Sequence, residues 1–210
     1  MKTDDLIALL SRDALLNERG SREKLTLALL AAVVMAGMVF AVIIRPRADL
    51  MTVATTTVFS IKLLFVLTLA LAAVGLLRAA AKTEARLPAM LGVIPVAVLL
   101  FGFAYDVSTE PVAQLGTRLV GKNAAFCLVA IPFMAIMPMV GLFYALRSSA
   151  PNSPTVAGAM AGFASGAIAA AFYALHCTDD SPFFVAVWYS AAILILTAIG
   201  AALGRRILAW

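Results

Sequence analysis

Charged residues, histidine and cysteine are all scarce in this sequence of 210 residues. Only 13% of the residues are charged and 63% are hydrophobic, whereas a soluble domain is about a quarter charged and at most about half apolar. The mean hydropathy of +1.02 excludes a water-soluble fold, because such a fold could not bury so much apolar surface. We therefore expect lipid to solvate much of the chain.

The scarcity of catalytic residue types argues against an enzyme. The chain has one histidine, His176, and its acidic residues lie almost wholly outside the apolar runs. It contains no His-Glu-x-x-His pair, no phosphate-binding glycine loop and no Gly-x-Ser-x-Gly turn. We expect neither catalysis nor a bound cofactor. The net charge of +5 does not indicate nucleic-acid binding, because the basic residues lie in short connections between apolar runs.

Six apolar runs approach the length of about 20 residues that a helix needs to cross a bilayer. Backbone groups must be paired within each segment in lipid, so we predict an all-α integral membrane protein. The expected spans are residues 25–44, 55–77, 88–105, 124–146, 155–175 and 183–203. The first run follows a long polar stretch and can itself span, which indicates an uncleaved anchor and not a signal peptide.

The basic residues predict the orientation, because cytoplasmic connections are enriched in Lys and Arg. With the N-terminus inside, eleven basic residues fall on the inner side and four on the outer side. The outer four are Arg45, Arg47, Arg118 and Lys122. We therefore expect both termini in the cytoplasm. The sixteenth, Lys62, falls inside a span, and we expect it near the outer surface, in reach of water or of Asp106 or Glu110.

Glycines at helical spacing mark the last two spans. They are Gly158, Gly162 and Gly166 in the fifth span and Gly200 and Gly204 in the sixth. Such ridges of small residues let helix backbones approach closely. We expect them to pack within one chain.

The two cysteines lie near the same end of the fourth and fifth spans. Counted from the connection between these spans, Cys127 and Cys177 reach similar heights on the outer side, within about one helical turn at 1.5 Å per residue. A disulfide could form there if the two helices are close neighbours. With His176 and Asp179, the cysteines could instead bind a soft metal ion. Spacing alone leaves two unrelated cysteines equally open.

The N-terminal segment predicts an amphipathic helix from Thr3 to about residue 17. Its apolar face comprises Leu6, Ile7, Leu9, Leu10, Ala14 and Leu16, and Asp13 lies inside that face. We expect Gly20 and Ser21 to separate this helix from the first span. The helix could lie on the membrane, but its aspartates would then face anionic headgroups, so a groove on a soluble, basic partner fits better.

Two segments resemble the NrsF family of bacterial anti-sigma factors. They are HCTDDSPFFVAVWY at residues 176–189 and MKTDDLI at residues 1–7. The specific positions of the longer string are His176, Cys177, Asp180, Ser181, Pro182, Trp188 and Tyr189. Asp179 stands where the family often has Glu, which keeps the charge. The likeness extends over the whole chain and includes a cysteine at each of two family positions.

The resemblance implies a transcription regulator in the bacterial inner membrane. Such proteins hold an extracytoplasmic-function sigma factor inactive through the cytoplasmic N-terminal segment, and release it when a heavy metal or an oxidant acts on paired cysteines. The implied units are a sigma-binding helix over residues 1–22 and a six-helix sensor over residues 23–210, with Cys127 and Cys177 as the sensor pair. The implied partners are the sigma factor, the bilayer and a transient metal ion or oxidant, without direct contact to nucleic acid.

Two other functions stay open on the residues themselves. A small transporter or metal-export accessory protein would use His176, Cys177 and Asp179 as an outer ligand site. A scaffold would have no sensing role at all. Flux in proteoliposomes would separate the transporter from an anti-sigma factor, and binding of a sigma factor to the N-terminal segment would separate the scaffold.

Overall fold

The computed structural model describes residues 3–81, 88–149 and 151–209, with the backbone alone for residues 3–19, and this part of the chain is helical between its connections. Six segments are long and apolar enough to cross a membrane. They are Gly20–Ile44, Thr57–Ala80, Ala89–Thr109, Ala124–Arg147, Pro154–Tyr173 and Pro182–Ile207. Each coincides with one of the six expected runs to within a few residues, so the predicted fold class is confirmed.

Several spans combine a long helix with a short helical turn of different pitch. The first consists of α1 (Thr3–Val39) and a π-helical turn, η1 (Phe40–Ile44), and the short α2 (Leu50–Val53) connects it to α3 (Thr57–Ala80). The third consists of η2 (Ala89–Gly92) and α4 (Val93–Thr109), followed by η3 (Val112–Gln114) and α5 (Leu115–Val120). The fourth span is α6 (Ala124–Arg147) and the fifth is α7 (Pro154–Tyr173). The sixth consists of α8 (Pro182–Phe184), the π-helical turn η4 (Val185–Tyr189) and α9 (Ser190–Ile207).

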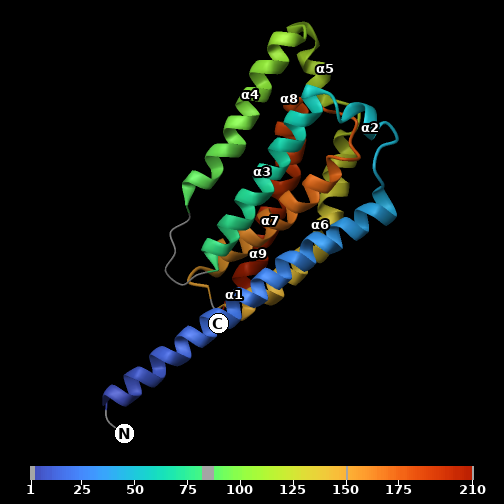
Figure 1. Cartoon of the computed structure of the whole chain (residues 1–210). Coiled ribbons are helices and arrows are strands. Elements are labelled where there is room, and N and C mark those ends of the chain that lie inside the picture. Colours follow the sequence, from blue (N-terminus) through green and yellow to red (C-terminus); the bar gives the residue numbers. More distant parts are fainter. Residues whose placement is uncertain (1–2, 82–87, 150, 210) are drawn as a thin grey trace.

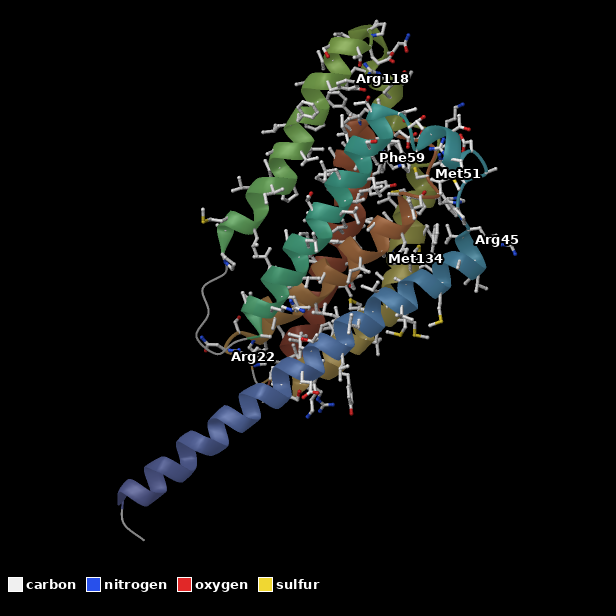
Figure 2. The ribbon with its side chains drawn as sticks, viewed as in Figure 1. Arg22, Arg45, Met51, Phe59, Arg118 and Met134 are labelled. Atoms are coloured by element: carbon white, nitrogen blue, oxygen red, sulfur yellow. The ribbon has the colours of Figure 1, made fainter. Side chains whose placement is uncertain are left out.

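The two ends of the bundle differ in what they carry. The C-terminus lies at the end where α1 leaves the bundle, and the N-terminal part of α1 extends beyond that end (Figure 1). We call it the terminal end. At the opposite, distal end lie α2, α5 and α8 (Figure 1). Arg22 and Arg45 mark these two ends of the first span, and Arg118 lies at the distal end (Figure 2).

The fifth span, α7, is the most buried of the six, because its small residues allow neighbours to approach on several sides. A Cβ atom placed on Gly162 would lie 2.1 Å from the carbonyl oxygen of Leu196, and one on Gly158 would lie 2.3 Å from that of Gly200. Backbone contacts this close require glycine. The glycine ridges of α7 and α9 therefore pack against each other within the chain, as expected.

The outward surface of the spans is strongly apolar. Large side chains that face outward include Leu27, Leu30, Leu100, Phe101 and Val140, on three different spans. On a soluble monomer an apolar surface of this extent would be exceptional. On membrane spans it is the surface that contacts lipid.

The junction between the N-terminal helix and the first span differs from the prediction. Because α1 runs unbroken from Thr3 to Val39, the expected separation at Gly20 and Ser21 is wrong. One glycine costs a helix only about 1 kcal/mol relative to alanine, and the Leu, Glu, Arg and Lys residues around it favour the helix. The predicted apolar face, namely Leu6, Ile7, Leu9, Leu10, Asp13, Ala14 and Leu16, falls outside the side chains that the structure describes.

Candidate functional site

Both cysteines lie at the distal end of the bundle. Cys177 is in the connection between α7 and α8, which we call the cysteine loop (residues 174–181), and Cys127 is in the first turn of α6. Both are free thiols, 1% and 0% exposed. They are close enough to interact electrostatically. The structure therefore brings the predicted pair together, without a bond between the two sulfurs.

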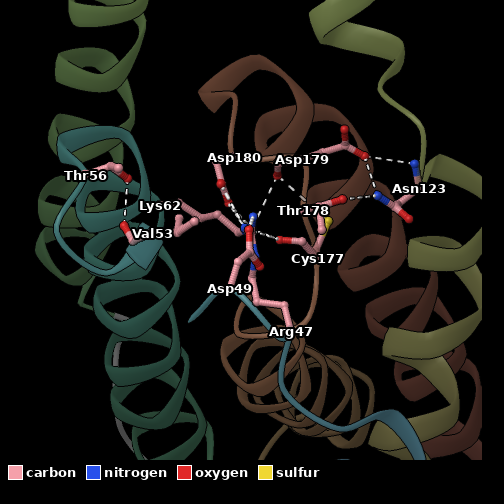
Figure 3. A network of polar contacts seen from close by, with 10 residues as sticks. All are labelled: Arg47, Asp49, Val53, Thr56, Lys62, Asn123, Cys177, Thr178, Asp179 and Asp180. Atoms are coloured by element: carbon pink, nitrogen blue, oxygen red, sulfur yellow. Dashed lines mark hydrogen bonds and ion pairs between the residues drawn. The ribbon is translucent and has the colours of Figure 1, made fainter. Parts of the chain in front are cut away.

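A buried lysine of α3 holds the cysteine loop in place. Lys62 is 2% exposed, and its ammonium group donates to the carbonyl oxygen of Cys177 at 2.7 Å, to Oδ1 of Asp180 at 2.8 Å and to the carbonyl oxygen of Asp179 at 3.3 Å (Figure 3). An ammonium has three donors and no acceptor, so these contacts engage all of them. A buried charge needs such partners, because without them its desolvation would be costly.

The partner predicted for Lys62 is wrong. The lysine is near the distal end of its span, as expected, but it pairs with Asp180 and not with Asp106 or Glu110. Asp106 is instead paired with Arg118 of α5. The cysteine loop folds over the end of α3 and supplies both the carboxylate and the carbonyl oxygens, so the amine does not need to reach water.

A second cation, Arg47, binds the cysteine loop from the connection after α1. Its Nη1 donates to Oδ2 of Asp180 at 3.0 Å and to the carbonyl oxygen of Cys177 at 3.3 Å (Figure 3). Its backbone N–H donates to the carbonyl oxygen of Leu175 at 3.1 Å. The guanidinium also binds both carboxylate oxygens of Asp49. This contact lowers the pKa of Asp49 and, together with Asp180, raises that of Arg47. The sequence indicated Arg47 only as one of the outer charges.

Asp179 connects the cysteine loop to the helix that carries Cys127. Its Oδ2 accepts hydrogen bonds from the backbone N–H of Asn123 at 2.8 Å and from the side-chain amide of Asn123 at 2.9 Å (Figure 3). It also accepts one from the backbone N–H of Lys122 at 3.0 Å. A carboxylate at the N-terminus of a helix also interacts favourably with the helix dipole. Asp179 therefore fixes the position of the loop relative to α6.

The turn before α6 depends on a glycine. Gly121 has φ +60°, and a Cβ atom there would lie 2.5 Å from the ring of Phe184. Neither Gly121 nor Asn123 was among the predicted site residues. The Gly-Lys-Asn sequence directly before an apolar run is nevertheless a turn and helix-start signal.

The side chain of His176 binds the end of the first span and not a metal site with the cysteines. Its Nδ1 donates to the carbonyl oxygen of Arg45 at 2.8 Å, and its ring packs beside Phe126 and Tyr173. Across the described ranges, no three His, Cys, Asp or Glu side chains gather in a group that could hold a metal ion. The structure therefore does not bring His176 and Asp179 together with the two thiols as a four-ligand site.

The other residues of the string at 176–189 also make defined contacts. Pro182 begins α8, and the indole N–H of Trp188 donates to the carbonyl oxygen of Leu119 at 2.9 Å. Ser181 precedes the helix, with its hydroxyl buried and without a hydrogen bond. Tyr189 packs its ring against Tyr173 with the centroids 5.6 Å apart. The string thus joins α7, α8 and α5 around Cys177.

The environment of Cys177 keeps its thiol protonated. Burial raises the pKa of Cys177, and the nearby ammonium of Lys62 opposes this shift without cancelling it. The thiolate is the reactive form of cysteine, so the resting thiol is a weak nucleophile at neutral pH.

An open cavity of about 750 Å³ lies beside the cysteine loop. Asp106, Arg118 and Lys122 line it on one side, and Asp179 and Ser181 line it from the loop. The cavity brings solvent to the residues that follow Cys177, although neither cysteine lines it.

Comparison with known proteins gives one family. The model of the NrsF family, described as negative regulator of sigma F, matches residues 10–210. The chain is similar to the probable anti-sigma-F factor NrsF of Azospira oryzae, with 29% identity over 215 aligned residues and all of both chains covered. It is also similar to the anti-sigma-F factor NrsF of Caulobacter vibrioides, with 37% identity over 108 residues and half of each chain covered. No solved structure matches it.

Proposed function

The chain belongs to the NrsF family of negative regulators of sigma F, which are anti-sigma factors and not enzymes, and from this we propose how it binds and releases its sigma factor. Residues 1–22 hold an extracytoplasmic-function sigma factor inactive at the cytoplasmic face of the bacterial inner membrane. Residues 23–210 release it when a heavy metal or an oxidant acts on Cys127 and Cys177. The family leaves the transporter alternative without support.

The observation that carries this proposal is the placement of the two free thiols. Both are buried at the distal end, opposite to the end from which the N-terminal part of α1 extends (Figure 1). If the excess of basic residues puts both termini in the cytoplasm, the thiols lie on the outer side. A signal received there must then cross the membrane through the helices.

The first span is the route that the contacts favour. The cysteine loop binds the distal end of this span through hydrogen bonds from His176 to Arg45 and from Arg47 to three loop residues, namely Leu175, Cys177 and Asp180. Arg45 has φ +65°, a conformation that persists for a non-glycine residue only where its surroundings enforce it. Because α1 is one continuous helix, a change in the loop can shift the cytoplasmic segment directly.

The seam between α7 and α9 is a poor route for the same signal. Its glycines already bring the two backbones into contact, so the helices have no space for a second arrangement. A ligand shifts a conformational equilibrium only by its difference in affinity for the two states. We therefore place the change between the cysteine loop and α1.

Sigma-dependent reporter transcription in cells tests the proposal. Deletion of residues 2–16 should give constitutive transcription, and Asp13→Lys should weaken repression more than Ser11→Lys. Cys127→Ser and Cys177→Ser should retain repression and lose the response to metal or oxidant, while the neighbouring Ala125→Ser should respond normally. A double cysteine variant that still induces normally would remove the thiols from the mechanism.

Two arginines of one connection test the route. Arg47→Ala removes the side-chain contacts to the cysteine loop and should retain repression with a reduced response. Arg45→Ala is the matched control, because Arg45 contributes its carbonyl oxygen and its side chain is exposed. Equal responses of the two variants would place the signal outside the first span.

A further inference from the structure

Two tyrosine hydroxyl groups beside the cysteines lack a hydrogen bond. Tyr173 is the last residue of α7 and Tyr189 the last of η4, and both side chains are 0% exposed with unpartnered hydroxyl oxygens. Both side chains lie beside Cys177: the backbone N–H of Cys177 donates to the carbonyl oxygen of Tyr173 at 3.0 Å, and the ring of Tyr189 packs on that of Tyr173 with the centroids 5.6 Å apart. Buried hydroxyls without partners are rare because each costs free energy, so two of them at one pair of thiols call for a physical reason.

We propose that Tyr173 and Tyr189 donate hydrogen bonds to the sulfur atoms once these carry negative charge, and that they thereby determine how tightly the thiol pair binds a soft metal ion. The inference rests on the proposed sensor role of the cysteines and adds two positioning residues to it. A protonated thiol is a weak acceptor. A thiolate is a charged acceptor, and hydrogen bonds to charged groups are roughly twice as strong as neutral ones.

The neighbouring cation cannot supply these hydrogen bonds. The ammonium of Lys62 favours negative charge on the sulfur of Cys177, but its three donors are already engaged by Cys177, Asp179 and Asp180. The two phenol O–H groups, in contrast, are available as hydrogen-bond donors. The sulfurs are therefore weak acceptors for the phenols while they are neutral, and become strong acceptors when they are thiolates.

Soft cations are the ligand class that this arrangement fits. Thiolates prefer soft metal ions over Mg²⁺ or Ca²⁺. As each sulfur–metal bond forms, the thiol proton leaves to solvent, and no electrons are transferred. Two thiolates and one divalent cation form a group without net charge but with strongly polar bonds, and the remaining sulfur lone pairs accept the phenol hydrogen bonds, which partly offset the cost of burying this polar group.

Cadmium binding to the purified full-length protein in detergent tests the inference. The sulfur-to-cadmium charge-transfer absorption reports binding, and competition with a chelator gives the affinity. Tyr173→Phe and Tyr189→Phe should each lower the affinity about tenfold, the effect of losing one charge-assisted hydrogen bond. The absorption band should also move to longer wavelength, because an unbonded sulfur lone pair is higher in energy. A packing defect alone would not move the band.

Tyr144→Phe is the matched control, because Tyr144 is exposed on the lipid-facing side of α6, and its affinity and band should equal those of the parent protein. Unchanged affinity and band in both site variants would overturn the inference, as would a parent protein that shows no cadmium–thiolate band. If the phenylalanine variants behave as expected while cells with both cysteines replaced still respond to stress, the proposed function fails and the tyrosine inference stands.

Discussion

At the scale of single residues, the cysteine loop depends on charges that the chain brings together from distant positions. Asp180 binds Lys62, which precedes it by 118 residues, and Arg47, which precedes it by 133. Removing one member of a buried ion pair costs more than the pair itself contributes, because the remaining charge stays buried. Lys62 is therefore expected to stabilise the loop strongly although it lies in a membrane span.

Lys62→Met should lower the free energy of unfolding by about 2 kcal/mol. This is less than the cost of leaving a buried charge without any partner, because Arg47 still binds Asp180. Thermal unfolding in detergent measures this. Lys122→Met is the control, because Lys122 is an exposed lysine at the same end. Adding Asp180→Asn to Lys62→Met should cost less than the sum of the two single changes. Strict additivity would show that the two residues do not interact.

A second prediction at this scale concerns Gly121. Gly121→Ala should destabilise the protein by about 2 kcal/mol, because alanine is strained at φ +60° and its Cβ would overlap the ring of Phe184. Gly116→Ala, in the adjacent α5, meets nothing within 4 Å and should be neutral or slightly stabilising. Similar melting temperatures for the two variants would contradict the tight turn before α6.

At the scale of elements, the glycine seam between α7 and α9 is expected to tolerate no added atom. Gly162→Ala places a methyl group against backbone, which cannot rotate away, and should cost about 3 kcal/mol. Gly20→Ala is the control, since nothing lies within 4 Å of that position and alanine favours the helix by about 1 kcal/mol. Unfolding measurements in which Gly162→Ala is as stable as Gly20→Ala would rule out backbone contact along the seam.

The elements also show what a sequence can predict. The six spans follow from hydropathy summed over about 20 residues, so small errors at the ends do not matter. The glycine ridges of α7 and α9 were predictable because helical spacing alone places them on one face. The break expected at Gly20 does not occur, because the weak preference of one glycine against helix is outweighed by the helix-favouring residues around it. The partners of Lys62 and Asp179 could not be found, because they depend on how distant segments of the chain meet.

At the scale of the whole molecule, the proposed function depends on which side of the membrane each end of the bundle faces. The excess of basic residues predicts that the terminal end faces the cytoplasm. Both termini lie at the terminal end (Figure 1), as six spans require. The cysteine loop and the proposed sigma-binding segment are thus at opposite ends of the bundle (Figure 1).

Introduced cysteines provide the test of this orientation, because native Cys127 and Cys177 are buried and a bulky reagent cannot reach them. In a Cys127→Ser, Cys177→Ser background, Thr109→Cys adds a thiol at the distal end and Ser148→Cys adds one at the terminal end, both at exposed positions. A membrane-impermeant maleimide should label the first in intact spheroplasts and the second only after permeabilisation. The reverse pattern would put the thiol pair in the cytoplasm, where reduction by cellular thiols opposes disulfides, and would remove the need for any signal to cross the bilayer.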